Sequence, residues 1–217
     1  MIRAAVFDLD GTLADTIGTI TYYGNRAMER FGLAPFLPEQ YKYFVGNGYE
    51  LLIRRMLEAA RAYSEALFAQ MKAFYHDDYE TDSMYLTKAY PGVLALIDAL
   101  KRAGIKLGVL SNKPHGAVCD VVRALFGNAF DCVQGQTAGT TLKPDPALLF
   151  SMLDGFGVLP EHCLYVGDTA TDIKTGKNAG AFTVGVTWGF RKEDELLAAG
   201  ADRIVFAPEE IAALAGV

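Results

Sequence analysis

A buried strand that ends in two carboxylates lies only a few residues into the chain. The apolar run Ala4–Phe7 predicts this strand, and Asp8, Leu9, Asp10 and Gly11 follow it directly. In a straight strand, the i, i+2 spacing of Asp8 and Asp10 would place both carboxylates on one face. Two negative charges so close together are unfavourable unless a cation accompanies them. The spacing therefore indicates a metal-dependent site rather than core packing.

The composition excludes several classes of protein. The 217 residues, 51% of them hydrophobic, are enough to bury a core in one domain or two. The net charge of −6 gives no electrostatic reason to expect nucleic acid or an anionic membrane surface as a partner. No apolar run approaches the ~20 residues of a membrane span, and no signal-peptide pattern precedes Asp8. We therefore expect a cytoplasmic protein.

The cysteines and histidines show no spacing typical of metal ligands. The cysteines are odd in number, far apart and in apolar surroundings, so we interpret them as reduced core thiols: Cys119, Cys132 and Cys163. The histidines lack partners at ligand spacing, and we interpret them as surface or satisfied core residues: His76, His115 and His162. Neither residue type predicts a zinc or redox site.

After Leu13 the pattern becomes helical for about 70 residues. It predicts a helix over 16–31, a second after the Gly46-Asn47-Gly48 turn, and a third that carries the apolar positions of 67–75. The first connection contains Gly32, Pro35 and Pro38, which are typical of turns. An insertion of this length can form a small domain. We expect residues 15–87 to be an all-helical cap domain and residues 1–14 and 88–217 to be the core.

Strands and helices alternate from residue 88 onward. Apolar runs predict strands at 105–110, near 132–133, and at 163–166, 181–186 and 203–206. Helical patterns lie between them, from Pro91 to Gly104 and over 116–125 and 146–156. This alternation predicts an α/β fold, a doubly wound and mostly parallel sheet with right-handed crossovers.

Polar side chains follow three of these strands at the point where each apolar run ends. Asp8 and Asp10 follow the first strand, Ser111 and Asn112 follow 105–110, and Asp168 follows 163–166. In open parallel sheets, ligands bind at the carboxyl ends of the strands. We therefore expect these residues, far apart in the sequence, to meet in one crevice.

Four short motifs resemble those of the haloacid dehalogenase superfamily of phosphotransferases, and they occur in that family's order. The motifs are Asp8-Leu9-Asp10-Gly11-Thr12, Leu110-Ser111-Asn112, Lys143-Pro144 and Gly167-Asp168-Thr169-Ala170-Thr171-Asp172. The resemblance spans nearly the whole chain. It implies a Rossmann-like core and a phosphatase that hydrolyses a small phosphorylated metabolite through an aspartyl-phosphate intermediate.

The resemblance also implies a role for each motif residue. Asp8 would be the nucleophile that attacks phosphorus, and Asp10 would be the general acid for the leaving oxygen and then the base for water. Ser111 and Lys143 would hold the phosphoryl oxygens, because an ammonium group suits an anion, and Asn112 would help to bind the substrate. The Pro144-Asp145-Pro146 segment that follows Lys143 would fix the direction of this lysine.

The same resemblance implies a metal site. Asp8, the backbone carbonyl of Asp10, and Asp168 would bind the ion, with Asp172 acting directly or through water. Oxygen ligands and a phosphate substrate favour Mg²⁺. The cation would also allow several carboxylates to approach an anionic phosphoryl group.

The helical insertion resembles that of the phosphoglycolate phosphatase subgroup. The similarity lies in Val45-Gly46-Asn47-Gly48, the helix that bears Arg54, and Ser111-Asn112-Lys113-Pro114. Gly46 and Gly48 would allow backbone amides to face an anion, and Asn47 would help to bind the substrate. Arg54 would clamp a carboxylate; a solvent-facing helix arginine is the alternative interpretation. The resemblance favours 2-phosphoglycolate as the substrate.

The position of the insertion, directly after Asp10, indicates how it would act. Hinges near 13–15 and 85–91 would let it close over the crevice, exclude bulk water and govern substrate choice. Trp188 follows the strand at 181–186, where it would pack against apolar residues or contact the rim of the crevice.

Alternative functions remain within and beyond phosphoryl transfer. A pyrophosphatase or a sugar phosphomutase would share the core motifs, whereas the presence of Asp10 disfavours dehalogenase chemistry. A non-catalytic binding module would be expected to lack a motif residue, and none is missing. The sequence is compatible with a monomer or a homodimer.

Overall fold

A parallel sheet forms the centre of the computed structural model, which describes residues 1–217. Its strand order is β5-β4-β1-β6-β7-β8, and all neighbouring pairs are parallel. The strands are β1 (Ala4–Phe7), β4 (Lys106–Pro114), β5 (Cys132–Gln136), β6 (Cys163–Gly167), β7 (Phe182–Val186) and β8 (Arg203–Val205). The predicted α/β class with a mostly parallel sheet is confirmed.

Helices cover both faces of this sheet. They are α5 (Val93–Arg102), α6 (His115–Phe126), α7 (Ala147–Phe156), α8 (Ala170–Ala179), α9 (Glu193–Ala198) and α10 (Pro208–Ala215), with a short 3₁₀ turn at Pro160–His162. In the central strand, Ala5 and Phe7 pack into the core beneath α5 and α6, whereas Ala4 and Val6 pack beneath α7. This alternation follows from the two-residue period of a strand. Burial on both faces explains why β1 is apolar throughout.

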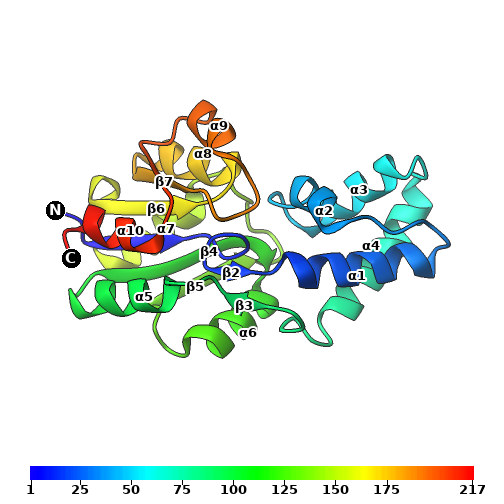
Figure 1. Ribbon diagram of the computed structural model, residues 1–217, viewed down its shortest axis with the longest axis horizontal. Helices are drawn as coiled ribbons and strands as arrows, with labels where there is room; N and C mark the ends of the chain where they lie inside the picture. Colours follow the sequence, from blue (N-terminus) through cyan, green and yellow to red (C-terminus); the bar gives the residue numbers. More distant parts are fainter.

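Four further helices lie between two short strands, β2 (Ala14–Asp15) and β3 (Lys88–Ala89), which pair antiparallel. They are α1 (Ile17–Arg30), α2 (Pro38–Phe44), α3 (Tyr49–Ala59) and α4 (Glu65–Tyr79). Figure 1 shows them grouped at the end of the molecule opposite the two termini. They enclose a separate apolar cluster, to which the rest of the chain contributes only Ala117 and Phe190.

Two predicted elements differ from the structure. The connection after the first helix contains α2, which begins at Pro38, where the fixed φ angle of proline suits a first helical turn. The Gln40 side chain accepts a hydrogen bond from the Leu37 backbone N–H and caps this helix. Strand β4 does not end at Leu110 but continues to Pro114, with an irregular register after Leu110. The polar residues of this extension, Ser111, Asn112 and Lys113, are buried, and each side chain forms a hydrogen bond within the protein.

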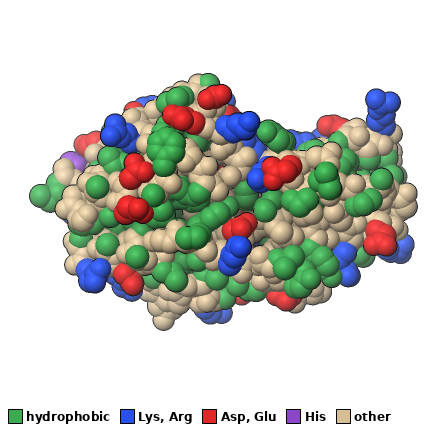
Figure 2. All heavy atoms as spheres, viewed as in Figure 1, with side chains coloured by type: hydrophobic (Ala, Val, Ile, Leu, Met, Phe, Trp, Pro, Cys, Tyr) green, Lys and Arg blue, Asp and Glu red, His purple; other side chains and the backbone are tan.

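The visible surface of the molecule carries charges of both signs. Figure 2 shows acidic and basic side chains interspersed over the visible face, with no continuous basic area. None of the helices has the length and apolar character that crossing a bilayer requires.

Candidate active site

The carboxyl ends of the three central strands meet at one edge of the sheet. Phe7, the last residue of β1, pairs with Val109 of β4 on one side and with Val166 of β6 on the other. Asp8 and Asp168 follow two of these strands directly, so the register brings the predicted motifs together. A cavity opens at this edge and is lined by residues of the sheet edge and of α1, α3 and α4.

Three buried carboxylates form an acidic triad at this edge, and two of them, Asp8 and Asp172, line the cavity. Asp8, Asp168 and Asp172 each offer one oxygen, and these oxygens lie within 4.8 Å of one another. Asp172 stands in the first turn of α8, where its Oδ2 accepts hydrogen bonds from the Thr169 backbone N–H (3.0 Å) and hydroxyl (2.6 Å). This capping box fixes the carboxylate on the sheet side of the helix and leaves Oδ1 for other partners.

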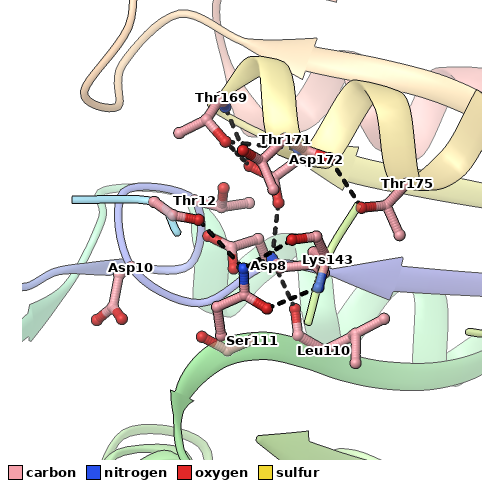
Figure 3. A network of polar contacts seen from close by, with 12 residues as sticks. Asp8, Asp10, Thr12, Leu110, Ser111, Lys143, Thr169, Thr171, Asp172 and Thr175 are labelled. Carbon is pink, nitrogen blue, oxygen red and sulfur yellow. Dashed lines mark hydrogen bonds and ion pairs between the residues drawn. The ribbon is translucent and has the colours of Figure 1, made fainter. Parts of the chain in front are cut away.

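Lys143 holds two members of the triad. Its Nζ lies 2.6 Å from Asp8 Oδ1 and 2.7 Å from Asp172 Oδ1, and it donates to the Leu110 carbonyl at 3.0 Å (Figure 3). All three N–H donors of the ammonium group are therefore engaged. Burial acts to lower the pKa of Lys143, but the two carboxylates outweigh it and hold this pKa well above its usual range.

Asp168 is fixed by its own set of contacts. Its Oδ1 accepts from the Thr12 hydroxyl at 3.3 Å, and its Oδ2 accepts from the Phe190 backbone N–H at 2.7 Å. The chain approaches so closely that a Cβ at Gly11 would lie 2.2 Å from Asp168 Oδ2. Gly11 also has a φ of +91°, which favours glycine. The geometry of this turn thus depends on the absence of a side chain at Gly11.

The electrostatics of the triad fit a divalent cation. Burial raises the pKa of Asp8 to about 7; Lys143 offsets part of this rise and Asp172 adds to it. Burial, and then the charges of Asp172 and Asp8, also raise the pKa of Asp168 well above its usual range. Three carboxylates with one lysine leave an excess of negative charge. Oxygen donors in this arrangement suit a hard cation.

Asp10 does not join the triad, contrary to the arrangement expected for a straight strand. Strand β1 ends at Phe7, and the chain then turns, with the backbone N–H groups of Leu13 and Ala14 donating to the Leu9 carbonyl. Figure 3 shows the Asp10 carboxylate pointing away from Asp8 and Lys143. Its Oδ1 accepts from Lys113 Nζ at 2.8 Å.

Ser111 and Asn112 lie beside Lys143, within β4. Asn112 Oδ1 accepts from the Lys143 backbone N–H at 2.8 Å, and its Nδ2 donates to the Lys143 carbonyl at 3.2 Å and to the Gly46 carbonyl at 3.3 Å. Asn112 thus ties the backbone of the catalytic lysine candidate to the helical segment. Ser111 Oγ accepts from the Lys113 backbone N–H at 3.2 Å, and its side chain lines the cavity.

The predicted residues of the helical segment are only partly at the cavity. Gly46 lines it, whereas Asn47 donates to Thr171 Oγ1 at 2.8 Å and accepts from Arg55 at 2.8 Å. Arg54 does not line the cavity: its guanidinium lies over the rings of Tyr63 (4.7 Å) and Phe68 (5.3 Å). The structure therefore does not place Arg54 as a carboxylate clamp, because it occupies a different face of α3 from the lining residues.

Several lining residues were not predicted from the sequence. Lys113 is buried and lies between Asp10 and Tyr79, whose hydroxyl is 2.7 Å from its Nζ. His76 lines the cavity, where its ring stacks on Tyr49, and its side chain is partly exposed, which is compatible with the surface interpretation of this histidine. Two features of the sequence could have predicted these lining residues: Lys113 lies two residues after Ser111, and the aromatic residues of α4 recur at helical spacing.

Trp188 packs at the edge of the core. Its indole N–H donates to the Thr12 carbonyl at 3.0 Å, and the side chain packs against the core cluster. Phe190, two residues later, lines the cavity. Arg191 donates to the carbonyls of Lys42 and Val45 in the helical segment. This loop therefore joins the core to the helical segment at the cavity rim.

Comparison with known proteins assigns the family. A model of the haloacid dehalogenase-like hydrolases matches residues 5–186. The chain belongs to this family. It is 36% identical over 202 residues to the phosphoglycolate phosphatase of Rhodospirillum rubrum, covering 89% of this chain and 83% of that one. It is 34% identical over 194 residues to the phosphoglycolate phosphatase of Pseudomonas putida, covering 87% and 70%.

Solved structures support the same assignment. A crystal structure from Lactobacillus delbrueckii subsp. bulgaricus matches with a TM-score of 0.93 and 30% identity, covering 98% of both chains. CbbY from Rhodobacter sphaeroides, solved in complex with phosphate, matches with a TM-score of 0.81 and 26% identity, covering 97% of this chain and 96% of that one. The predicted family and the predicted enzyme class, a phosphoric monoester hydrolase, are confirmed. Phosphatases of the haloacid dehalogenase-like family are metal-dependent, and the acidic triad of this member could hold the metal.

Proposed function

We propose that this haloacid dehalogenase-like hydrolase is a Mg²⁺-dependent phosphatase that cleaves a small phosphate monoester through a covalent intermediate on Asp8. The observation that carries the proposal is the arrangement around Lys143. This lysine lines the cavity and contacts Asp8 and Asp172 at 2.6 and 2.7 Å, and buried Asp168 completes an acidic triad with these two carboxylates. A nucleophile, a cation and a set of metal ligands thus share one buried site.

Two displacements make up the reaction. In the first, an Asp8 carboxylate oxygen attacks phosphorus, the ester bond breaks, and Asp10 gives a proton to the leaving oxygen. In the second, Asp10 takes a proton from water, the water oxygen attacks phosphorus, and Asp8 is released with inorganic phosphate. The turn after β1 directs Asp10 away from the triad, which suits a group that acts on the leaving oxygen rather than on the metal.

Lys143 and Ser111 would bind the phosphoryl oxygens. Lys143 already lies beside Asp8, so its charge would offset that of the transferring group. Asn112 holds the Lys143 backbone through both of its amide atoms, which positions the ammonium group. Ser111 offers a hydroxyl at the same edge of the sheet.

Mg²⁺ would be held by Asp8, the backbone carbonyl of Asp10, Asp168 and Asp172. When bound, it supplies positive charge that stabilises the phosphoryl oxygens and the ionised carboxylates. Thr12 and the Phe190 backbone N–H orient Asp168 for this role, and Thr169 orients Asp172. Such supporting contacts set the direction of metal ligands.

The helical segment, residues 15–87, would act as a cap on the core formed by residues 1–14 and 88–217. The β2–β3 ribbon joins the two parts, and Asn47, Tyr79 and the Gly46 carbonyl contact the core across the cavity. Closure of this cap would exclude bulk water from the phosphoryl group. The cap would also determine which leaving groups are accepted, because residues of α1, α3 and α4 line the end of the cavity away from the sheet.

2-Phosphoglycolate is the substrate that we propose. Support comes from the relatives in Rhodospirillum rubrum and Pseudomonas putida, which bear the name phosphoglycolate phosphatase and align over most of this chain. Pyrophosphate and sugar phosphates are the competing substrates on the same core.

Phosphate release tests the proposal directly. Purified protein with Mg²⁺ is expected to release phosphate from 2-phosphoglycolate faster than from pyrophosphate or sugar phosphates, and Asp8→Asn is expected to abolish release. Isomerised sugar phosphate without net release would identify a mutase. Binding of monoesters without turnover across a broad panel would instead identify a binding module.

A further inference from the structure

Lys113 enters the cavity with a hydrogen-bond donor to spare. The lysine is 8% exposed and lines the cavity, and its Nζ lies 2.8 Å from Asp10 Oδ1 and 2.7 Å from the Tyr79 hydroxyl. An ammonium group has three N–H donors, and two are used by these partners. The structure provides no protein acceptor for the third.

No other cation at the cavity is equally free. Lys143 is the only other lysine among the lining residues; its donors go to Asp8, Asp172 and the Leu110 carbonyl, and the proposed function assigns its charge to the phosphoryl group. No arginine lines the cavity. His76 Nε2 lies 3.7 Å from the Glu80 carboxylate, which offsets any charge that it carries. An anionic group on the substrate, apart from the phosphoryl group, therefore has one suitable partner.

The position of Lys113 identifies where that anionic group would be. The inference rests on the proposed function, in which Asp10 reaches the ester oxygen of the leaving group. Because Lys113 Nζ is one hydrogen bond away from Asp10, its spare donor serves a group close to that oxygen. A carboxylate on the carbon that bears the ester oxygen meets this requirement.

We propose that Lys113 binds the carboxylate of the leaving group, so that the site selects phosphate monoesters of α-hydroxy acids. Tyr79, from the cap, holds the same ammonium group and places it only when α4 lies over the core. Lys113 is thus a specificity-determining residue that no motif role includes. It is distinct from Lys143, which serves the phosphoryl group.

The rest of the leaving-group end limits the size and charge of the substrate. Its cap side is lined by apolar and aromatic side chains and by one acid, Glu80, whose carboxylate lies 3.7 Å from His76 Nε2; the side chains are those of Ile20, Val45, Tyr49, Leu52, Tyr75, His76, Tyr79 and Glu80. A second anionic group, remote from the ester oxygen, would meet Glu80 and these rings without an unpaired cation. Leaving groups with a distal phosphate are therefore disfavoured.

A pair of matched substrates isolates the contribution of Lys113. 2-Phosphoglycolate and its amide have nearly the same size, but the amide lacks the negative charge of the carboxylate. With Mg²⁺, the wild type is expected to favour the carboxylate in kcat/KM by about 10- to 100-fold, the range of one hydrogen bond between charged groups. In Lys113→Gln this preference is expected to fall to about one- to threefold, and Lys113→Arg is expected to keep most of it.

The ratio between the two substrates is the readout, because Lys113 also contacts Asp10 and its loss would slow both reactions. Lys72→Gln is the matched control, since Lys72 pairs with Glu50 on the surface of the cap; it is expected to leave the ratio unchanged. If Lys113→Gln turns over too slowly, calorimetric binding of the two compounds in an Asp8→Asn background measures the same preference. Circular dichroism and thermal unfolding report whether each variant is folded.

The possible outcomes separate this inference from the proposed function. Equal kcat/KM values for the two compounds in the wild type, or an undiminished preference in Lys113→Gln, would overturn the role of Lys113 while phosphatase activity stands. A wild type that releases phosphate from no monoester would overturn the proposed function itself. Loss of the preference in Lys113→Gln together with its retention in Lys113→Arg would support the inference.

Discussion

At the sheet end of the cavity each acidic side chain has a fixed partner, whereas the end formed by the helical segment is mostly apolar and aromatic. Asp8 and Asp172 bond to Lys143, Asp10 bonds to Lys113, and Asp168 accepts from a hydroxyl and a backbone N–H. At the other end, which we call the cap end after the role proposed for the helical segment, Tyr79 is the lining residue whose side chain bonds across to this network. The sheet end of the cavity therefore holds paired charges, whereas the other end offers an apolar surface that fits a substrate by its shape.

This difference separates two tasks. Buried charges have to be paired and oriented in advance, because an unpaired charge in the interior is strongly unfavourable. Apolar and aromatic walls carry no such requirement and can vary with the leaving group. We therefore expect changes at the sheet end to affect all substrates alike, and changes at the cap end to affect substrates differently.

Asp8→Asn is expected to give the largest effect. The amide is a poor nucleophile, so the variant should lose about 10⁴-fold or more in kcat on every phosphate monoester that the wild type accepts. Phosphate release over a substrate panel measures this loss. Unequal losses across the panel would contradict the expectation that changes at the sheet end affect all substrates alike. Retained turnover would exclude Asp8 as the nucleophile.

Lys143→Met tests the sheet end through stability as well as activity. Removing the ammonium group leaves Asp8 and Asp172 buried and unpaired, at a cost of about 3–5 kcal/mol in the free energy of unfolding. We expect kcat to fall by about 10²- to 10³-fold on all substrates. Urea unfolding and steady-state kinetics check the two expectations.

Lys177→Met is the control for this variant. Lys177 also contacts a carboxylate, that of Asp202 at 2.7 Å, but its side chain is 43% exposed. Such a surface pair contributes at most about 1 kcal/mol. A similar loss of stability in Lys143→Met and Lys177→Met would show that the buried ion pairs contribute no more to the free energy of unfolding than a surface pair does.

Metal removal tests the electrostatics of the triad. In the metal-free protein, the pKa of Asp8 lies near 7 instead of its ordinary 3.8, so between these values the folded state binds more protons than the unfolded state. Stability should therefore fall as the pH rises through that window. Saturating Mg²⁺ should reverse the fall above pH 7, adding about 2.7 kcal/mol at 100 times its dissociation constant.

Asp168→Asn keeps the size of one ligand but removes its charge. This variant should lose most of the stabilisation by Mg²⁺ in thermal unfolding scans at pH 7.5, whereas the wild type retains it. A metal-dependent shift of equal size in both proteins would contradict the assignment of the triad as the metal site.

The sheet end is the part of the site that the sequence predicts well. Apolar runs followed by Asp8 and Asp168 mark strand ends, and parallel strands bring their ends to one edge. The end of β4 is harder to predict, because Ser111 and Lys113 remain in the strand although they are polar. Their burial depends on partners that are distant in the sequence, such as Asp10.

The cap end shows where sequence patterns stop being sufficient. Arg54 and Arg55 are neighbours with the same side chain, and only their position around α3 separates them. Arg55 bonds to the Phe44 carbonyl and to Asn47, each at 2.8 Å, whereas Arg54 lies over Tyr63 and Phe68. The rotation of a helix about its axis depends on tertiary packing, so the choice between two adjacent arginines requires the structure.

The two arginines also give the subtlest test of the comparison, with the smallest expected effect. Arg55→Gln loses two hydrogen bonds that support the turn of Gly46 and Asn47, so we expect KM for 2-phosphoglycolate to rise by up to about tenfold while kcat changes little. Arg54→Gln should keep KM within about twofold and lose only about 0.5–1 kcal/mol of stability through its cation–π contacts. Michaelis–Menten kinetics and urea unfolding of both variants measure these effects. If Arg54→Gln raised KM more than Arg55→Gln, the substrate would contact the face of α3 that lies away from the cavity, and the assignment of the lining residues to the leaving group would be wrong.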